Sequence, residues 1–278
     1  MSELRFTKMH GCGNDFVVVD CMKEPAPNLA KFARKLAHRR FGVGADQILT
    51  VAPSAVADFK MEIYNADGSQ VEMCGNGIRC LAKYVYDHGL TEKKELQVET
   101  LGGVVRPRIL GKLVEVDMGE PILEGREIPV NADGRILNYS LDVDGTEYEV
   151  SCVSMGNPHC VVYPDAELDH LDLEGIGPRF EYNSFFPKRV NTEFVEIIKP
   201  DEVRVRVWER GAGETWACGS GACAVAVAGA LTGRTARKVT IHLLGGDLKV
   251  EWRDDNHVYM TGGAEEVFQG AIRFEEGA

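Results

Sequence analysis

The sequence predicts an α+β protein of two pseudo-symmetric, β-rich lobes, each wrapped around a central apolar helix. Three observations lead to this fold class. Most regular segments have the pattern of short strands, the chain repeats itself once, and one helical segment carries no charge on any face. The active site is expected between the lobes, because the residues that carry chemistry occur in both copies of the repeat.

Strand-like segments occur along the whole chain. They are short, rich in β-branched residues or alternating in polarity, and they end at Gly or Asp, as strands do. These segments are FVVVD, ADQILTVA, FKMEIYNA, LQVETLGGVV, KLVEVDMG, YEVSCVSM, HCVVYP, EFVEIIK, VRVRVWER, KVTIHLLGG, DLKVEWR and HVYMTGG. Helices are expected to be few, at NLAKFARKLAHR, GIRCLAKYVYDHG and GACAVAVAGALTG.

The last of these helices is the apolar one. It has no charged residue from Gly221 to Leu231. A helix that is apolar all round is buried all round, and at this length it is a core helix and not a membrane span. Its Ala and Gly content suits close enclosure by strands, so we expect each half to be a curved sheet or barrel around one helix.

The internal repeat is centred on two cysteines. The segments MEIYNADGSQVEMCGNGIRCLAKYV and VRVWERGAGETWACGSGACAVAVAG align without gaps and place Cys74 on Cys218, an offset of 218 − 74 = 144. Blocks in the same order and at an offset of 143 or 144 are typical of a two-fold duplication. The same relation pairs Asn14 with Asn157, Gln47 with Asn191, and Asn65 with Glu209.

The boundary between the halves is expected near Met118, in a stretch where Gly and Pro interrupt the regular pattern. This gives an N-terminal lobe of residues 1–118 and a C-terminal lobe of residues 119–262. The remaining tail, 263–278, is expected to pack with the N-terminal lobe.

Composition limits the classes of partner. The net charge of −12 over 278 residues argues against nucleic acid and against an anionic membrane, since both require a basic surface. It leaves a small-molecule substrate open, because a few backbone N–H groups and one arginine bind a carboxylate locally. The chain has no run of eighteen apolar residues and no signal-peptide pattern at its start, so we expect a cytoplasmic protein.

The eight cysteines show no C-x-x-C pair, so neither a metal site nor a disulfide scaffold is expected. Cys12 is given no catalytic role. Five others are interpreted as small buried apolar residues. They are Cys21, Cys80, Cys152, Cys160 and Cys223.

Cys74 and Cys218 each follow a strand and a Gly/Asp-type loop, and each precedes a helix that begins with glycines. A helix start carries unpaired N–H donors and partial positive charge, which bind carboxylates and lower a thiol pKa. Two such thiols on opposite sides of one substrate carbon suit inversion, since one removes a proton and the other delivers one. We therefore expect a cofactor-independent amino-acid epimerase. A pair of buried structural thiols, a metal pair or a disulfide pair remains the alternative.

At these residues the sequence resembles the diaminopimelate epimerase family over nearly the whole chain. The resemblance rests on HGCGNDFVVVD, GADQ, NADGSQVEMCGNGIRC, MGNPHCV, VNTEFVE and VWERGAGETWACGSGACA. It implies a two-lobed fold and epimerisation of LL-2,6-diaminopimelate to the meso form in lysine biosynthesis, without pyridoxal phosphate and without a metal.

The resemblance also implies roles for individual residues. Cys74 and Cys218 match the acid–base pair, and His159 and Glu209 match residues that tune the thiols. The helix starts that hold the α-carboxylate correspond to Gly75, Asn76, Gly219 and Ser220. The remaining substrate contacts correspond to Asn14, Gln47, Asn65, Asn157, Asn191, Glu209 and Arg210.

Arg210 suits the distal carboxylate of such a substrate, because a guanidinium donates two parallel hydrogen bonds. Simpler interpretations stay open for these positions. The asparagines beside Gly, Ala or Pro could be turn formers, and Glu209 with Arg210 could be an exposed ion pair. His159 could equally be a core residue.

Three other functions compete with this one. A proline or hydroxyproline racemase also pairs two cysteines on a similar fold but needs no distal arginine, and a pyridoxal-phosphate racemase would show a visible absorption band. A thiol-based metal or redox module is the third. The resemblance also implies a homodimer. Because the two thiols are expected to lie close together, we further expect that oxidation can join Cys74 and Cys218 in a disulfide that switches activity off.

Overall fold

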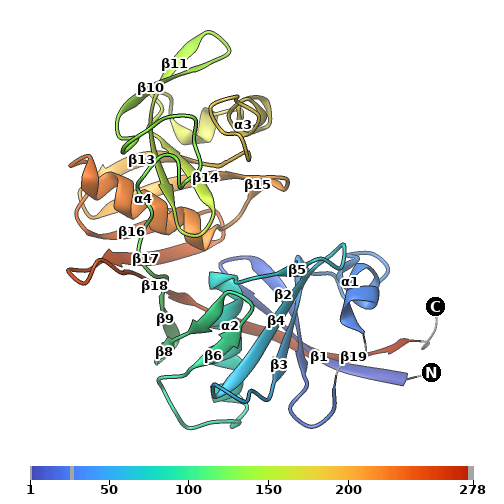
Figure 1. Cartoon of the computed structure of the whole chain (residues 1–278). Helices are drawn as coiled ribbons and strands as arrows, with labels where there is room; N and C mark the ends of the chain where they lie inside the picture. Colours follow the sequence, from blue (N-terminus) through green and yellow to red (C-terminus); the bar gives the residue numbers. More distant parts are fainter. Residues whose placement is uncertain (1, 26–27, 275–278) are drawn as a thin grey trace. The chain divides into compact units, whose positions relative to one another are not determined.

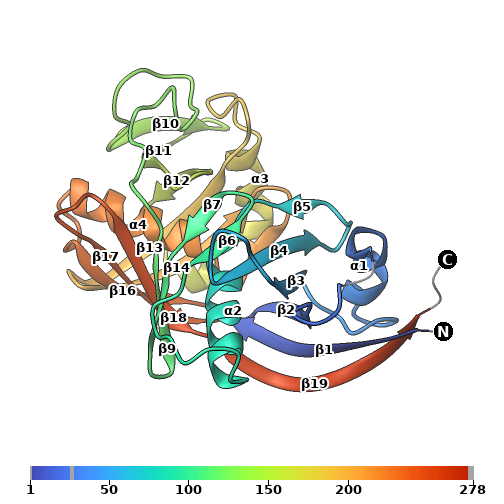
Figure 2. The same ribbon diagram turned by 60° about the horizontal axis from the view of Figure 1, so that its bottom comes forward.

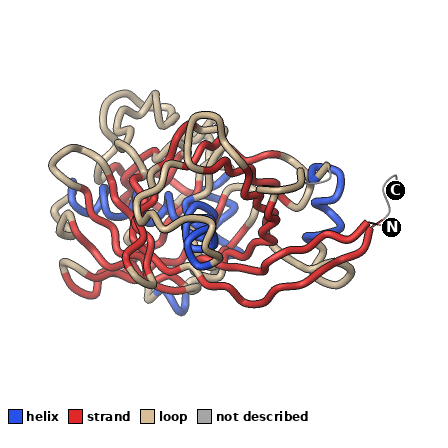
Figure 3. Tube along the Cα trace, turned by 90° about the horizontal axis from the view of Figure 1, so that it is seen from below, coloured by secondary structure: helices blue, strands red, loops and turns tan. Residues whose placement is uncertain are grey.

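The computed structural model describes residues 2–25 and 28–274, and the chain divides into two compact units. One comprises Met1–Val116 and Gly262–Ala278, and the other Asp117–Thr261. The sequence placed these boundaries at 118 and 262; residues 275–278 of the expected tail lie outside the described residues. Both units consist mainly of strands with few helices (Figures 1 and 3), which confirms the α+β fold class.

The first unit contains one sheet, two helices and the hairpin β8–β9, which is not part of that sheet. Its strands follow the order β19-β1-β2-β3-β4-β6-β7, with β5 paired to β4. The elements are β1 (Ser2–Gly11), β2 (Asn14–Asp20), α1 (Leu29–Ala37), β3 (Gln47–Ala52), β4 (Phe59–Asn65), β5 (Gln70–Val71), α2 (Gly75–Asp87), β6 (Val98–Thr100), β7 (Gly103–Val105), the hairpin β8 (Pro107–Leu110) and β9 (Leu113–Asp117), and β19 (Glu265–Phe274). Figure 2 shows α2 beside β1 and β2, and it also contacts β3, β4 and β19.

The second unit repeats this plan. Its strands follow the order β10-β11-β12-β13-β14-β16-β17-β18, with β15 paired to β14. The elements are β10 (Tyr139–Val143), β11 (Thr146–Ser154), β12 (Pro158–Val162), a 3₁₀ turn (Leu168–His170), α3 (Leu173–Glu181), β13 (Asn191–Lys199), β14 (Glu202–Glu209), β15 (Gly213–Thr215), α4 (Gly219–Leu231), β16 (Lys238–Leu243), β17 (Gly246–Trp252) and β18 (Val258–Gly263). Helix α4 contacts β11, β12, β13, β16 and β17.

The duplication read from the sequence is visible in the strand pairing. β2 pairs with β3 in parallel, β3 with β4 antiparallel, and β4 with β6 in parallel across α2. β12, β13, β14 and β16 repeat this series across α4. The two helices begin 219 − 75 = 144 residues apart and end 231 − 87 = 144 apart. The repeat therefore places the two cysteines at equivalent positions.

The two central helices differ in polarity. Helix α4 is enclosed as its apolar composition predicted, and every residue from Ala222 to Ala228 is fully buried. Helix α2 is less apolar and contains Arg79, which is also fully buried. The Arg79 guanidinium donates to the backbone oxygens of Gly75 and Gly263, both at 3.2 Å, so its donors reach partners inside the unit.

Several elements were not expected from the sequence, among them β1, β5, β8, β10, β15, β19 and α3. β1 pairs with β19 on one side and β2 on the other, so the beginning and end of the chain lie side by side in one sheet (Figures 1 and 3). The run LQVETLGGVV forms two strands with a tight turn at Leu101–Gly102. Helix α3 was missed because Gly175, Gly177 and Pro178 give its segment the composition of a loop.

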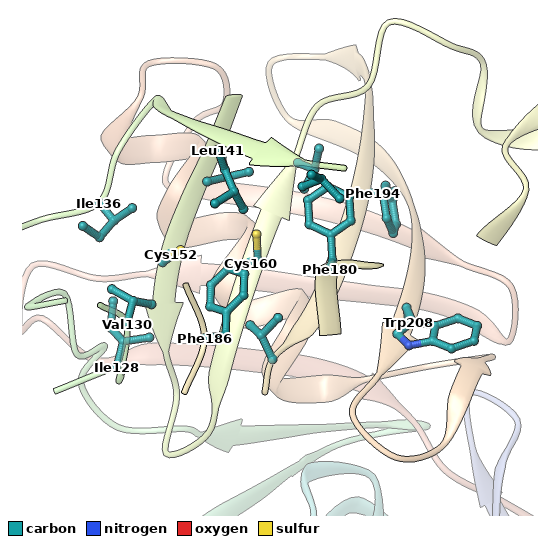
Figure 4. Packing of buried hydrophobic residues seen from close by; sticks show 14 of the residues in the cluster. Ile128, Val130, Ile136, Leu141, Cys152, Cys160, Phe180, Phe186, Phe194 and Trp208 are labelled. Atoms are coloured by element: carbon teal, nitrogen blue, oxygen red, sulfur yellow. The ribbon is translucent and has the colours of Figure 1, made fainter. Parts of the chain in front are cut away.

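Packing explains why α3 forms in spite of that composition. Phe180 of α3 contacts Phe194 edge-on, with ring centroids 5.5 Å apart, inside an apolar cluster that also contains Trp208 (Figure 4). A Cβ on Gly177 would lie 2.2 Å from the Trp208 ring, so only glycine allows this approach. Burial of the aromatic face thus outweighs the weak helix propensity of the segment.

In the described part of the chain, none of the helices combines the length and the apolar character needed to span a bilayer.

Candidate active site

Cys74 is the N-cap residue of α2 and has extended backbone angles, φ −138° and ψ 117°. Its thiol lies 3.7 Å from Asn14 Oδ1, which accepts from it. The same oxygen accepts a 3.2 Å hydrogen bond from Asn76 Nδ2 in the first turn of the helix. Three residues that the sequence assigned to the site are therefore joined in one hydrogen-bonded group.

The orientation of the Asn14 amide is fixed by Asp46. Asn14 Nδ2 donates to Asp46 Oδ2 at 3.0 Å, which turns Oδ1 toward the cysteine. Arg39 holds the other Asp46 oxygen at 2.7 Å and also pairs with Asp15. Burial raises the pKa of Asp15, but hydrogen bonds from Arg39 and Lys8 outweigh this and bring it to about 2. This charged network supports the start of β2, where Asn14 lies.

Gln47 and Asn65 face each other on β3 and β4. They are direct neighbours in the strand register, and Gln47 Nε2 donates to Asn65 Oδ1 at 2.9 Å. Asn65 Nδ2 donates in turn to Ser69 Oγ at 3.0 Å. Among the described residues Gln47 Oε1 is buried without a hydrogen-bond partner, so it offers an acceptor to a ligand.

Cys218 is the N-cap residue of α4, but its surroundings differ from those of Cys74. It is 6% exposed, its sulfur accepts a 3.4 Å hydrogen bond from the Gly221 backbone N–H, and it lies 3.5 Å from Ser220 Oγ. Glu209, at the end of β14, accepts hydrogen bonds from Thr215 Oγ1 and from the Cys218 thiol. The thiol is therefore placed against a carboxylate.

The expectation that the helix start lowers the thiol pKa is wrong for Cys218. Burial raises its pKa well above the ordinary value, and the nearby charges of Glu209 and Glu193 raise it further. The hydrogen bonds from Ser220 and Gly221 oppose this without cancelling it. Burial likewise raises the pKa of Glu209, although its bond from Thr215 acts in the opposite direction. Desolvation is the largest cause of both shifts.

His159 lies beside this thiol and is fully buried. Its Nδ1 is 2.7 Å from Glu193 Oε1, and its Nε2 is 3.0 Å from Asn157 Oδ1. A ring nitrogen of His159, a carboxylate oxygen of Glu193 and the sulfur of Cys218 all lie within 4.8 Å of one another. Because both ring nitrogens already have partners, we interpret these side chains as a hydrogen-bonded group, and chemistry without a metal stays a prediction.

Asn191 and Arg210 are joined through the backbone. Asn191 Oδ1 accepts from the Arg210 backbone N–H at 2.9 Å, and its Nδ2 donates to the Pro158 oxygen at 2.9 Å. Asn191 thus supports the strand ends around it. The Arg210 side chain is exposed, and one of its Nη atoms donates to the Lys188 backbone oxygen at 3.0 Å. That a carboxylate binds to this guanidinium stays a prediction.

Helix α3 anchors the turn that carries Glu209 and Arg210. Glu181, 2% exposed, accepts from Trp208 Nε1 at 2.9 Å and from the Gly211 backbone N–H at 3.0 Å. The two bonds fix the chain on either side of Glu209. The unexpected helix therefore has a direct consequence for the site.

Within each unit the structure gathers the residues that the sequence assigned to it. Asn14, Cys74, Gly75 and Asn76 lie together in the first unit, with the Gln47–Asn65 pair on adjacent strands. Asn157, His159, Glu209, Cys218, Gly219 and Ser220 lie together in the second, with Asn191 and Arg210 beside them. Cys80, Cys152, Cys160 and Cys223 are buried, Cys21 is partly buried, and none of the described cysteines forms a disulfide.

Three contributors were missed by sequence reasoning: Asp46, Glu193 and Thr215. Glu193 had a usable signal. It stands two residues after Asn191 on the same strand and hence points to the same face. It is also an acidic residue within an otherwise uncharged run, NTEFV. Asp46 and Thr215 act only through other side chains, which one sequence does not reveal.

Comparison with known proteins agrees with this geometry. The family model described as "Diaminopimelate epimerase" matches residues 6–124 and 151–267. A diaminopimelate epimerase of Acetivibrio thermocellus is 52% identical, covering 98% of this chain and 100% of its own length. Those of Moorella thermoacetica and Methanococcus maripaludis are 54% and 48% identical, covering 96% and 97% of this chain and 98% and 99% of their own.

Solved structures of low sequence identity share the fold. A PhzF-family phenazine biosynthesis protein of Bacillus anthracis superposes with a TM-score of 0.69 at 16% identity, covering 99% of this chain and 100% of its own. A hydroxyproline epimerase of Agrobacterium vitis gives 0.69 at 13% identity, covering 99% of this chain and 94% of its own. On the strength of the family match and of the relatives near 50% identity, the chain belongs to the diaminopimelate epimerase family.

Proposed function

We propose that this protein epimerises LL-2,6-diaminopimelate to meso-diaminopimelate, in lysine biosynthesis, with Cys74 and Cys218 as the acid–base pair and without a cofactor. The observation that carries the proposal is the repeated placement of a cysteine at the N-cap of a buried helix, 144 residues apart. Inversion of a carbon needs a proton acceptor on one face and a donor on the other. A duplicated fold is a direct way to provide both.

The surroundings of the two thiols suit an amino-acid substrate. The N-termini of α2 and α4 present backbone N–H groups and a positive dipole end, which favour the α-carboxylate as charge develops beside it. Gln47 Oε1, which has no hydrogen-bond partner among the described residues, and the Glu209 carboxylate are acceptors for ammonium groups. Arg210 provides a bidentate donor for a second, distal carboxylate. A substrate with two amino-acid ends uses all of these groups.

The proposed reaction uses both thiols. One thiolate removes the α-proton, and the carbanionic charge spreads onto the carboxylate held at the helix N-termini. The opposing thiol then delivers its proton to the other face, and the cysteines exchange roles in the reverse direction. A protonated Cys218, held by burial beside two carboxylates, is the form that delivers a proton.

The direct test is incubation of LL-diaminopimelate with the purified protein and no added pyridoxal phosphate, followed by chromatographic separation of the stereoisomers. We expect the meso isomer to form. No conversion, or conversion that depends on added cofactor, would overturn the proposal.

A proline or hydroxyproline racemase is the second candidate, because such an enzyme shares the fold. Arg210→Met separates the two. It removes the distal carboxylate partner and should raise KM for diaminopimelate at least about tenfold, since a charge-assisted pair contributes about 1.5–3 kcal/mol. Lys188→Met is the matched control, because the Lys188 contact to Arg210 uses only its backbone oxygen. Racemisation of proline by both variants, with no turnover of diaminopimelate, would favour the second candidate.

The homodimer and the cytoplasmic location remain predictions of the same proposal. Sedimentation equilibrium tests the first, and fractionation of the source cells tests the second.

A further inference from the structure

Glu193 is a fully buried carboxylate on β13 that the reaction outlined above does not use. Its Oε1 is 2.7 Å from His159 Nδ1, and among the described residues its Oε2 is buried without a hydrogen-bond partner. A buried charge with an unsatisfied oxygen is costly, and such a group persists where it has a role beyond packing.

The first unit shows that the fold itself does not need this carboxylate. By the offset of 144, Glu193 corresponds to Leu49, and by the offset of 143, His159 corresponds to Phe16. Both residues of the first unit are fully buried and apolar. The strand registers agree, because Phe16 pairs with Gln47 as His159 pairs with Asn191. The same slot is therefore filled by Phe and Leu beside Cys74, and by His and Glu beside Cys218.

The helix next to this slot is adapted to Glu193. A Cβ on Gly221 would lie 2.4 Å from Glu193 Oε1, so the first turn of α4 and the carboxylate are in close contact. The Gly221 backbone N–H meanwhile donates to the Cys218 sulfur. On the equivalent Gly77 of α2, the three atoms nearest to such a Cβ are side-chain carbons of Phe16, Leu49 and Ile63, at 3.3 to 3.4 Å. The polar pair of His159 and Glu193 therefore lies against the start of α4.

We propose that Glu193 is a positioning residue that fixes the His159 ring and keeps Cys218 protonated between turnovers. The assignment rests on the proposed function, in which Cys218 is one of the two proton-transferring thiols. Glu193 accepts the Nδ1 proton of His159 and so sets its tautomer and the direction of Nε2. Its negative charge, within 4.8 Å of the sulfur, disfavours the thiolate.

The charged and titratable groups around Cys218 come from three strands. They are His159 on β12, Glu193 on β13 and Glu209 on β14, while Ser220 and the Gly221 N–H face the sulfur from its own helix. Burial is the largest cause of the raised Cys218 pKa, and both carboxylates add to it. Removal of one carboxylate therefore makes the thiolate easier to form.

The test is a titration of the thiolate absorbance at 240 nm in substrate-free protein. Each protein is titrated with and without the additional substitution Cys218→Ala, and the difference between the two curves is the signal of Cys218. We expect Glu193→Gln to move the onset of this signal down by at least about one pH unit, tenfold in thiolate fraction. Glu196→Gln removes a carboxylate on the same strand that accepts a hydrogen bond from Arg204, and it should leave the onset where it is in the wild type. An unchanged onset in Glu193→Gln, or an equal shift in both variants, would overturn the proposal.

A second variant keeps the proposal testable if Glu193→Gln does not fold. His159→Phe with Glu193→Leu copies the first unit, and apolar replacement of a buried polar pair is often neutral for stability. We expect this double variant to keep its melting temperature and to lose at least about a hundredfold in kcat. A folded double variant with wild-type turnover would refute a role for the pair. Because the titration contains no substrate, its result is separate from whether diaminopimelate is the substrate.

Discussion

Gly221→Ala is a sharp test of how tightly the start of α4 is fitted to its surroundings. The new Cβ would be 2.4 Å from Glu193 Oε1, whereas ordinary contact begins at 3.4 Å, so the carboxylate must move by about 1 Å. That movement strains the 2.7 Å bond to His159, which has no exposed surface through which to relax. Overpacking costs about 1–3 kcal/mol and a weakened buried bond about 1–3 kcal/mol, while alanine recovers about 1 kcal/mol of helix propensity. The net loss is about 1–5 kcal/mol.

Gly77→Ala is the matched control, at the equivalent position of α2. There the Cβ would meet the far ends of Phe16, Leu49 and Ile63 side chains at 3.3 to 3.4 Å, and these yield by a few tenths of an ångström. We expect its stability to change by less than about 1 kcal/mol. Melting temperature followed by scanning calorimetry measures both variants. Equal stability of the two variants, or a larger loss at Gly77, would show that contact with Glu193 does not govern the start of α4.

Three further variants test other parts of the site. Thr215→Val removes a hydrogen bond that lowers the pKa of Glu209, so the limb of the pH–kcat/KM profile that depends on Glu209 should move to higher pH; a move to lower pH would contradict this. Asp46→Ala frees the Asn14 amide and should lower kcat/KM at least about tenfold with little change in fold by circular dichroism, whereas unchanged kinetics would remove Asp46 from the site. The pKa of Asp15 falls from 3.8 to about 2 on folding, so its carboxylate stabilises the protein above pH 4 by about 2 kcal/mol, and this stabilisation is lost as the pH falls toward 2. Asp15→Asn should therefore flatten the dependence of the unfolding free energy on pH between 4 and 2. An unaltered slope would contradict this prediction.

The parts of the fold that a sequence predicts well here are those with a repeated or strongly apolar pattern. The absence of charged residues in α4 predicted that this helix is buried, and the paired cysteines indicated the duplication. Helix α3 could not be predicted locally, because its stability comes from the contact of Phe180 with Phe194 and from the approach of Gly177 to Trp208. These contacts join segments that are distant in the chain.

The site shows the same division. Residues next to the cysteines, and residues that recur in both halves, were found from the sequence. Glu193 was not, because the repeat places it opposite Leu49 and so hides it from any comparison between halves. Its spacing from Asn191 indicates the face it points to, but its contact with His159 needed the structure, in which the two side chains are 2.7 Å apart. The raised pKa of Cys218 also needed the structure, since the helix start alone predicts the opposite direction.

Turnover of LL-diaminopimelate in heavy water tests the two-thiol reaction most directly. The account predicts deuterium at one α-carbon only, in the meso product, because the proton delivered comes from a thiol that exchanges with solvent. Cys74→Ala and Cys218→Ala should each abolish epimerisation. Deuterium at both α-carbons of a single product molecule in the first turnover, or full epimerisation by either variant, would contradict it.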